Sequence, residues 1–133
     1  MKDSLVPGLE RTARIAIDRD RTIGFMGDDC RVYATPELVR DIELTCRDLI
    51  LEHVDAGEGS VGTRVEVDHL AATPLGMWVD ITVTVDAVEG RQVAFAVTAA
   101  DALDKVARGV HRRFVVDTAK TADRLRAKAA RAG

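Results

Sequence analysis

The sequence predicts an α+β domain in which an antiparallel sheet curves around one long helix. Two observations lead to this prediction. The segment from Thr35 to Val54 has a single broad apolar face with helical periodicity. The region from Val61 to Asp117 is a series of strand-length runs in which valines alternate with polar residues. Both elements have one face to bury, so we expect the sheet to pack its apolar face on the helix.

The chain begins with a weakly alternating run at 11–17, which predicts a first strand that suits the edge of the sheet. The following segment, 18–34, has no sustained period and carries Phe25, Met26 and Tyr33 among charged residues and glycines. Two interpretations remain open for it. It is either a lid loop over a pocket or a loop that Phe25 and Met26 pin to the core.

The start of the helix is well specified. The hydroxyl of Thr35 can cap it, Pro36 suits the first helical position, and Glu37 favours the positive end of the helix dipole. The helical periodicity predicts an apolar face and an opposite polar face. The apolar face comprises Leu38, Val39, Ile42, Cys46, Leu49, Ile50 and Val54, and the polar face comprises Arg40, Asp41, Asp48 and Glu52.

Glu43 falls within the apolar face of this helix. A buried carboxylate costs several kcal/mol unless it is paired, hydrogen-bonded or protonated, so its position needs a reason. One interpretation is an edge glutamate that reaches water past Arg47. The other is a functional acid in a pocket, and the helix alone does not decide between them.

The strands follow in order. The run 61–69 alternates cleanly and places His69 in phase with Val65 and Val67, on the face that must cover the helix. An acid and an imidazole are therefore expected on facing surfaces. A hairpin turn at 89–90 joins strands 77–88 and 91–100, and 105–117 is a further strand. The inward residues of the hairpin are Val79, Ile81, Val83, Val85, Ala87, Val93, Phe95, Val97 and Ala99.

The C-terminal segment 118–133 is alanine-rich and basic, which predicts a solvated helix or tail. We expect residues 1–133 to form a single domain with the hot-dog architecture, a sheet wrapped around a central helix. Such a sheet leaves an edge strand open, which predicts pairing into a homodimer, with a tetramer as a further level of assembly.

Composition narrows the class of protein. A formal charge of -3 with 47% apolar and 31% charged residues is typical of a globular protein and gives no attraction to nucleic acid or membranes. Cys30 and Cys46 have no metal-ligand spacing and form no disulfide framework. With no membrane-length apolar run and no signal peptide, we expect a cytoplasmic protein without a metal or cofactor.

Several motifs, in their order and spacing, resemble the hot-dog acyl-CoA thioesterases of the fluoroacetyl-CoA thioesterase type. They are ATPELVRDIE at 34–43, GEGSVGTRVEVDHLAATPLGM at 57–77, VEGR at 88–91 and GVHRRFVVD at 109–117. The resemblance runs from about Val32 to Val116. Each motif alone is weak, but together they are fairly specific.

The resemblance implies roles for five residues. The catalytic threonine, glutamate and histidine of the family fall on Thr35, Glu43 and His69. The family's glycine before the histidine strand falls on Gly62, which would place an N–H near the thioester oxygen, and its pocket arginine falls on Arg113.

The implied function is hydrolysis of a short- or medium-chain acyl-CoA. Segment 18–34 looks shorter than the aromatic-bearing lid of the family member specialised for fluoroacetyl-CoA, so we do not expect that substrate here. Phe25 and Met26 are the lid residues expected to contact substrate. A non-catalytic acyl-CoA binding or sensing module is the alternative function.

Overall fold

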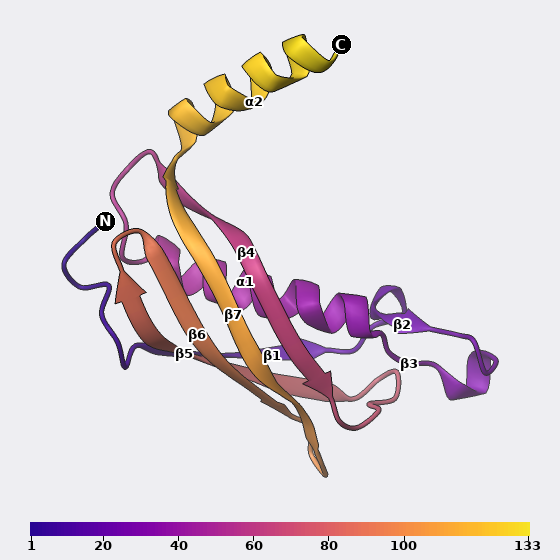
Figure 1. The fold of residues 1–133 in the computed structure, drawn as a ribbon. Helices are drawn as coiled ribbons and strands as arrows, with labels where there is room; N and C mark the ends of the chain where they lie inside the picture. Colours follow the sequence, from indigo (N-terminus) through magenta and orange to yellow (C-terminus); the bar gives the residue numbers. More distant parts are fainter.

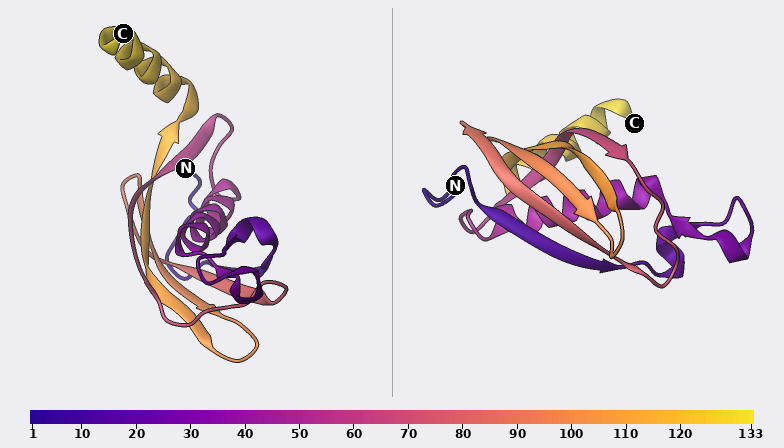
Figure 2. Two further views of the ribbon diagram at one scale, coloured as in Figure 1. Left: turned by 90° about the vertical axis from the view of Figure 1, so that its right-hand side faces the viewer. Right: turned by 90° about the horizontal axis from the view of Figure 1, so that it is seen from below.

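The computed structural model describes residues 1–133 and contains one antiparallel sheet wrapped around one helix, as predicted. The strands are β1 (Glu10–Ala16), β4 (Glu58–His69), β5 (Trp78–Glu89), β6 (Gln92–Ala100) and β7 (Lys105–Asp117). The central helix is α1 (Thr35–Leu51), and α2 (Thr118–Ala132) follows β7. Figure 1 and the left view of Figure 2 show α1 lying along the concave side of the curved sheet.

The sheet order is β1-β5-β6-β7-β4, with all neighbours antiparallel. β5, β6 and β7 form the predicted meander. β4, which follows α1 in the chain, pairs with β7 at the edge of the sheet opposite β1. Sequence periodicity could not predict this pairing because it says nothing of which strands are neighbours. β1 and β4 are therefore the two edge strands, and β4 carries His69 at its end.

The core lies between the sheet and α1. The inward residues predicted for β5 and β6 are buried, with one exception. A β-bulge between Val85 and Ala87 shifts the register, so that Val88, rather than Ala87, pairs with the buried Val93 and packs against the core. The prediction for Ala87 was therefore wrong, because alternation is interrupted where one strand has an extra residue.

The segment 18–34 forms a small projecting finger (Figure 1). It contains the short strands β2 (Thr22–Ile23) and β3 (Val32–Tyr33), with the 3-10 turns η1 (Arg19–Arg21) and η2 (Asp28–Cys30). The side chains at its tip are open to solvent: Phe25 is 89% and Met26 is 70% exposed. These two residues therefore do not pin the finger to the core of this chain.

The helix α2 projects from the end of β7 beyond the body of the domain (Figures 1 and 2). None of its residues is buried. Asp117 caps the helix by accepting a hydrogen bond from the Lys120 N–H at 2.9 Å. No helix of the structure is both long enough and apolar enough to cross a membrane.

Candidate active site

Thr35 lies at the first turn of α1, next to the end of β4. Its predicted role as the helix cap is wrong: Ala34 is the N-cap residue, and no side chain caps this end. The Thr35 hydroxyl instead lies 2.8 Å from Nδ1 of His69. The side chain that could have capped the helix is thus engaged with an imidazole, at the end of the helix where the dipole favours negative charge.

His69 is half-buried and has only this one side-chain hydrogen bond. Its other ring nitrogen, Nε2, is buried without a hydrogen-bond partner. Burial lowers the pKa of His69 below the ordinary histidine value, and the backbone of Ala71 opposes part of the shift. The ring is therefore held in its neutral form, which is the form that accepts a proton from a hydroxyl.

Glu43 does not face His69. Its side chain is 44% exposed, and Oε1 lies 3.5 Å from Nη1 of Arg113. Glu43 is two turns beyond Thr35, or about 12 Å along the helix axis at 1.5 Å per residue. The expectation that Glu43 and His69 face one another is not met within this chain, because Glu43 contacts Arg113 whereas His69 contacts Thr35.

Arg113 points inward from β7 and is buried. Its guanidinium donates from Nε to Oγ of Ser60 at 2.8 Å and from Nη2 to the Ser60 carbonyl at 2.9 Å. Burial lowers the pKa of Arg113, while the Glu43 carboxylate opposes that shift. With two of its nitrogens fixed on β4, Arg113 presents Nη1 to Glu43.

His111 lies beside Arg113 and was not assigned a role from sequence. It is 1% exposed, and its Nδ1 is 2.8 Å from the carbonyl of Arg64, so Nδ1 carries the proton. Its Nε2 then accepts from Nη1 of Arg113 at 3.3 Å. Burial lowers the pKa of His111, and Arg113 lowers it further. His111 is thus a neutral support for Arg113.

Gly62 of β4 lies beside the carboxylate of Glu43. A Cβ atom at this position would overlap Oε1 of Glu43 and would lie 3.3 Å from both Arg113 Nη1 and His111 Cε1. Gly62 also pairs with Arg113 in the β4–β7 ladder, just before a register shift. The absence of a side chain therefore lets Glu43 and Arg113 reach the β4 backbone, where the N–H of Gly62 had been predicted to act.

The predicted residues thus form two groups within one chain. Thr35 and His69 border a hollow of about 280 Å³ that is also lined by Ile23, Val32, Tyr33, Leu70, Ala71 and Ala72. The second group lies farther along α1, where Glu43 meets Gly62 of β4 and Arg113 of β7. Phe25 and Met26 belong to neither group in this chain.

Asp41 was predicted to lie on the polar face of α1, and this was wrong. It is 3% exposed and accepts hydrogen bonds from the hydroxyl of Tyr33 and the guanidinium of Arg21. Burial and the Asp41 carboxylate raise the pKa of Tyr33, which keeps its hydroxyl a donor. Sequence analysis missed this network because the finger 18–34, which has no periodicity, covers that side of the helix.

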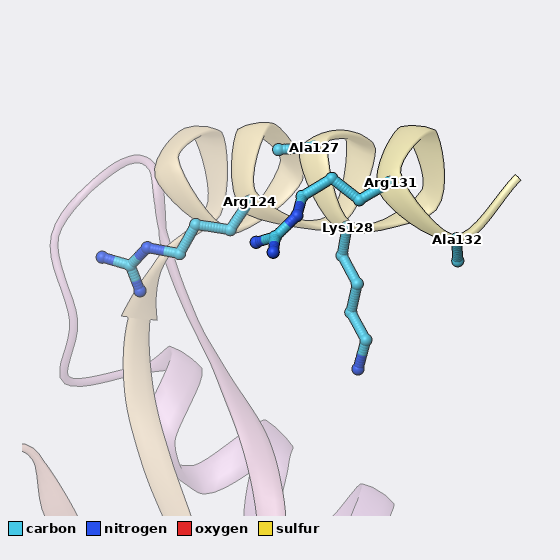
Figure 3. A pocket seen from close by; sticks show the side chains of 5 residues that line it. All are labelled: Arg124, Ala127, Lys128, Arg131 and Ala132. Carbon is cyan, nitrogen blue, oxygen red and sulfur yellow. The ribbon is translucent and has the colours of Figure 1, made fainter.

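A larger hollow, of about 640 Å³, lies along α2 and away from both groups. Figure 3 shows that the cationic side chains of Arg124, Lys128 and Arg131 extend from the same side of this helix. None of the predicted catalytic residues lines it. No cluster of three or more histidine, cysteine, aspartate or glutamate residues in the structure could hold a metal ion.

The curved sheet wrapped around one central helix is the hot-dog fold, which solved thioesterases share. A family model described as fluoroacetyl-CoA-specific thioesterase matches residues 17–119. The chain belongs to this family, whose members are thioester hydrolases.

Individual relatives agree with the family match. The fluoroacetyl-CoA thioesterase of Streptantibioticus cattleyicolor is 31% identical over 96% of this chain and 97% of its own length. A solved fluoroacetyl-CoA thioesterase superimposes with a TM-score of 0.86 at 30% identity, covering 95% of this chain and 98% of that one. A Thermus thermophilus member of the thioesterase superfamily gives the same TM-score and identity, covering 94% of this chain and 93% of that one.

A further solved structure, of a point mutant of the fluoroacetyl-CoA-specific thioesterase, is in complex with fluoroacetate and CoA. It is 30% identical to this chain with a TM-score of 0.78, and the match covers 86% of this chain and 98% of that one.

Proposed function

We propose that this chain hydrolyses the thioester of short- or medium-chain acyl-CoA, with Thr35, His69 and Glu43 as its catalytic residues. The observation that carries the proposal is the 2.8 Å contact between the Thr35 hydroxyl and Nδ1 of His69 at the start of α1. A hydroxyl paired with a neutral imidazole is an activated nucleophile or an orienting group for water. The relative solved in complex with CoA and fluoroacetate supports CoA as the carrier.

The chemistry needs an oxygen nucleophile, a proton carrier and stabilisation of the oxyanion. Neutral His69 accepts the proton of the attacking oxygen and returns it to the CoA sulfur as the carbon–sulfur bond breaks. The positive end of α1 and the N–H of Gly62 stabilise the negative charge on the thioester oxygen. Glu43, fixed by Arg113, orients the water that completes hydrolysis.

Two routes use these groups. In one, Thr35 attacks the thioester, releases the CoA thiol and forms an acyl ester that water then cleaves. In the other, Thr35 and Glu43 position a water molecule that attacks directly. A burst of thiol release before the steady state would identify the acyl-enzyme route, because the first product then leaves before the slower second step.

The proposal includes a homodimer, since each chain presents two incomplete groups on the same open side. β4 is an edge strand, and its Val65 is 43% exposed. An open strand edge with an exposed apolar side chain favours pairing with another strand. Antiparallel pairing of two β4 strands about a twofold axis near residues 65 and 66 would set Gly62 opposite His69 of the partner. Each site would then combine Thr35 and His69 of one protomer with Glu43 and Arg113 of the other.

The hollow beside Thr35 and His69 supports a small acyl group. It has a volume of about 280 Å³, and six of its eight lining residues are apolar or aromatic side chains. Tyr33, one of the two aromatic residues of segment 18–34, is fixed in the core, and Phe25 is exposed. We therefore do not propose fluoroacetyl-CoA as the preferred substrate. Phe25 and Met26 are assigned to contacts with substrate across the dimer.

A non-catalytic acyl-CoA binding module is the second candidate. It is favoured by one observation, the separation of Glu43 from Thr35 and His69 within a chain. If pairing does not complete the site, the chain would hold a thioester without cleaving it.

The unpaired state of Cys30 and Cys46 fits a reducing compartment, and we keep the cytoplasm as the expected location of the protein.

The test is a panel of saturated acyl-CoA thioesters from acetyl-CoA to dodecanoyl-CoA, together with fluoroacetyl-CoA, with detection of the released thiol. We expect turnover that is highest among the short and medium chains. His69→Ala and Glu43→Ala should each reduce kcat by at least about a hundredfold, the typical contribution of acid–base catalysis. Tight binding of the thioesters without thiol release would instead select the binding module, and full activity of both variants would show that the site is wrong.

A further inference from the structure

Asp41 is a buried acid that the chemistry above does not use. Its carboxylate is 3% exposed. Oδ2 accepts from the Tyr33 hydroxyl at 2.5 Å and from Nε of Arg21 at 2.9 Å, and Oδ1 accepts from Nη2 of Arg21 at 3.2 Å. A buried carboxylate is tolerated when it is paired and fully hydrogen-bonded in this way. Both partners come from the segment immediately before α1, so Asp41 ties that segment to the helix.

Arg21 and Tyr33 also fix the backbone that leads to Thr35. The carbonyl of Arg21 accepts from the N–H of Ala34 at 2.8 Å, and the N–H of Tyr33 donates to the carbonyl of Thr73 at 2.9 Å. Thr35 follows directly after Ala34. The backbone that delivers the Thr35 hydroxyl is therefore anchored from Asp41 through Arg21 on one side and through Tyr33 on the other.

Tyr33 also contacts the catalytic histidine. Its ring lies edge-on to the ring of His69, with centroids 6.3 Å apart and an interplanar angle of 79°. Tyr33 is 1% exposed, and its hydroxyl is bound by Asp41. His69 has a hydrogen bond on Nδ1 alone, and Nε2 has no partner to fix the ring plane. Beyond the contact with Thr35, packing therefore sets the orientation of the His69 ring, and Tyr33 is the aromatic residue that packs against it.

We propose that Asp41 is a positioning residue of this active site: through Tyr33 it fixes the His69 ring at hydrogen-bond distance from Thr35, and through Arg21 it fixes the start of α1. Asp41 does not touch the substrate and acts through these side chains. This role rests on the proposed thioesterase function. It predicts that loss of the carboxylate impairs the chemical step more than the binding of acyl-CoA.

A merely structural role would affect stability alone, and the chain offers a matched control for it. On the outer side of the sheet Arg14 binds Asp80 in the same two-nitrogen geometry, with distances of 2.8 and 2.9 Å. Asp80→Asn and Asp41→Asn therefore remove the same charge from the same kind of pair. Only Asp41 connects to Tyr33 and His69.

The variants are Asp41→Asn, Tyr33→Leu, which removes the ring, and Tyr33→Phe, which keeps it. We expect Asp41→Asn and Tyr33→Leu to lower kcat by about tenfold or more, with KM changed by less than about twofold, because the ground-state contacts remain. Tyr33→Phe keeps the ring but loses the hydrogen bond to Asp41, so it should lower kcat in the same direction. Asp80→Asn should stay within about threefold of the wild-type kcat, since the whole network is kept.

The second readout needs no substrate. The pKa of His69, followed by its ring NMR signals across a pH titration, should rise toward the ordinary histidine value in Asp41→Asn and Tyr33→Leu, because a displaced ring admits water. It should stay at the wild-type value in Asp80→Asn. Thr35, Tyr33 and the Arg21–Asp41 pair behind Tyr33 are the polar or charged groups on this side of the imidazole.

The two readouts separate the proposals. If Asp41→Asn and Tyr33→Leu both keep the wild-type kcat and the wild-type His69 titration, Asp41 has no positioning role. If the wild-type protein releases no thiol from any acyl-CoA, the proposed function fails, while the titration still tests the positioning. Should Asp41→Asn not fold, Tyr33→Phe decides, because it keeps the ring and removes only the hydrogen bond that links Tyr33 to Asp41.

Discussion

At the scale of single residues, His69 has two ring nitrogens in different surroundings. Nδ1 lies 2.8 Å from the Thr35 hydroxyl, whereas Nε2 is buried and without a partner. Buried polar atoms are seldom left unpaired, and those that are often mark a position where substrate or water binds. Nε2 is therefore the atom that we expect to meet an incoming group, while Nδ1 faces the Thr35 hydroxyl.

The lowered pKa of His69 gives a prediction for the pH dependence of kcat/KM. The imidazole acts as a base only when neutral, so kcat/KM should rise with pH through a midpoint below about 6.5, the ordinary histidine value. The measurement is thiol release between about pH 5 and pH 8. His53→Gln is the control and should keep the same rise of kcat/KM with pH, because His53 contacts Ser4 rather than the site. A midpoint well above the ordinary value would contradict the assignment of His69.

The burial of two acids on α1, Glu43 and Asp41, was not predicted correctly from the sequence. Periodicity placed Glu43 on the buried face and Asp41 on the exposed one, and the structure reverses them. A helical period shows which residues share a face but not what covers that face. The finger 18–34 covers Asp41, and the open edge beside β4 leaves Glu43 accessible. Strand phase set His69 opposite Glu43, and family resemblance grouped both with Thr35; the structure brings His69 to Thr35 instead.

At the scale of elements, β4 has two places where the backbone is approached closely. At Gly62 a Cβ would meet the end of the Glu43 side chain, which is flexible. At Gly109 of β7 a Cβ would overlap the carbonyl oxygen of Glu66 and lie 2.9 Å from Cα of Val67, both on the β4 backbone. The first glycine makes room for the Glu43 side chain, and the second makes room for strand pairing.

These two glycines predict opposite effects of alanine. Gly62→Ala should displace Glu43 from Arg113 and lower kcat by about tenfold or more, with little loss of stability. Gly109→Ala must shift a strand and should cost roughly 1–3 kcal/mol of unfolding free energy. Chemical denaturation and thiol release separate the two. A Gly62→Ala enzyme with wild-type kcat would show that the position of Glu43 is unimportant.

The order and length of most elements were predictable because strands and helices have different periods. β7 has the predicted bounds, while α1 ends at Leu51 rather than Val54. The valines of β5 and β6 revealed the core by their alternation. The pairing of β4 with β7 and the finger at 18–34 could not be predicted. Long-range pairing and irregular segments leave no periodic signal in a single sequence.

At the scale of the whole molecule, the open side of the protomer carries all of the predicted catalytic residues. Thr35, Val39 and Glu43 are spaced four residues apart and form one stripe on α1. Edge strand β4 runs beside this stripe with exposed Val65 between Gly62 and His69. A second chain on this side would cover the edge and join the two groups. We therefore predict a dimer whose active sites are shared.

Mixed dimers test this central claim most directly. Glu43→Ala and His69→Ala chains, each inactive alone, are mixed, exchanged through mild denaturant, and assayed for thiol release. Random pairing makes half of the dimers mixed, and each mixed dimer has one intact site of two, so about a quarter of the wild-type activity should return. Light scattering should show a dimer throughout. No recovery in mixtures shown to exchange would contradict a site built from Thr35 and His69 of one chain and Glu43 of the other.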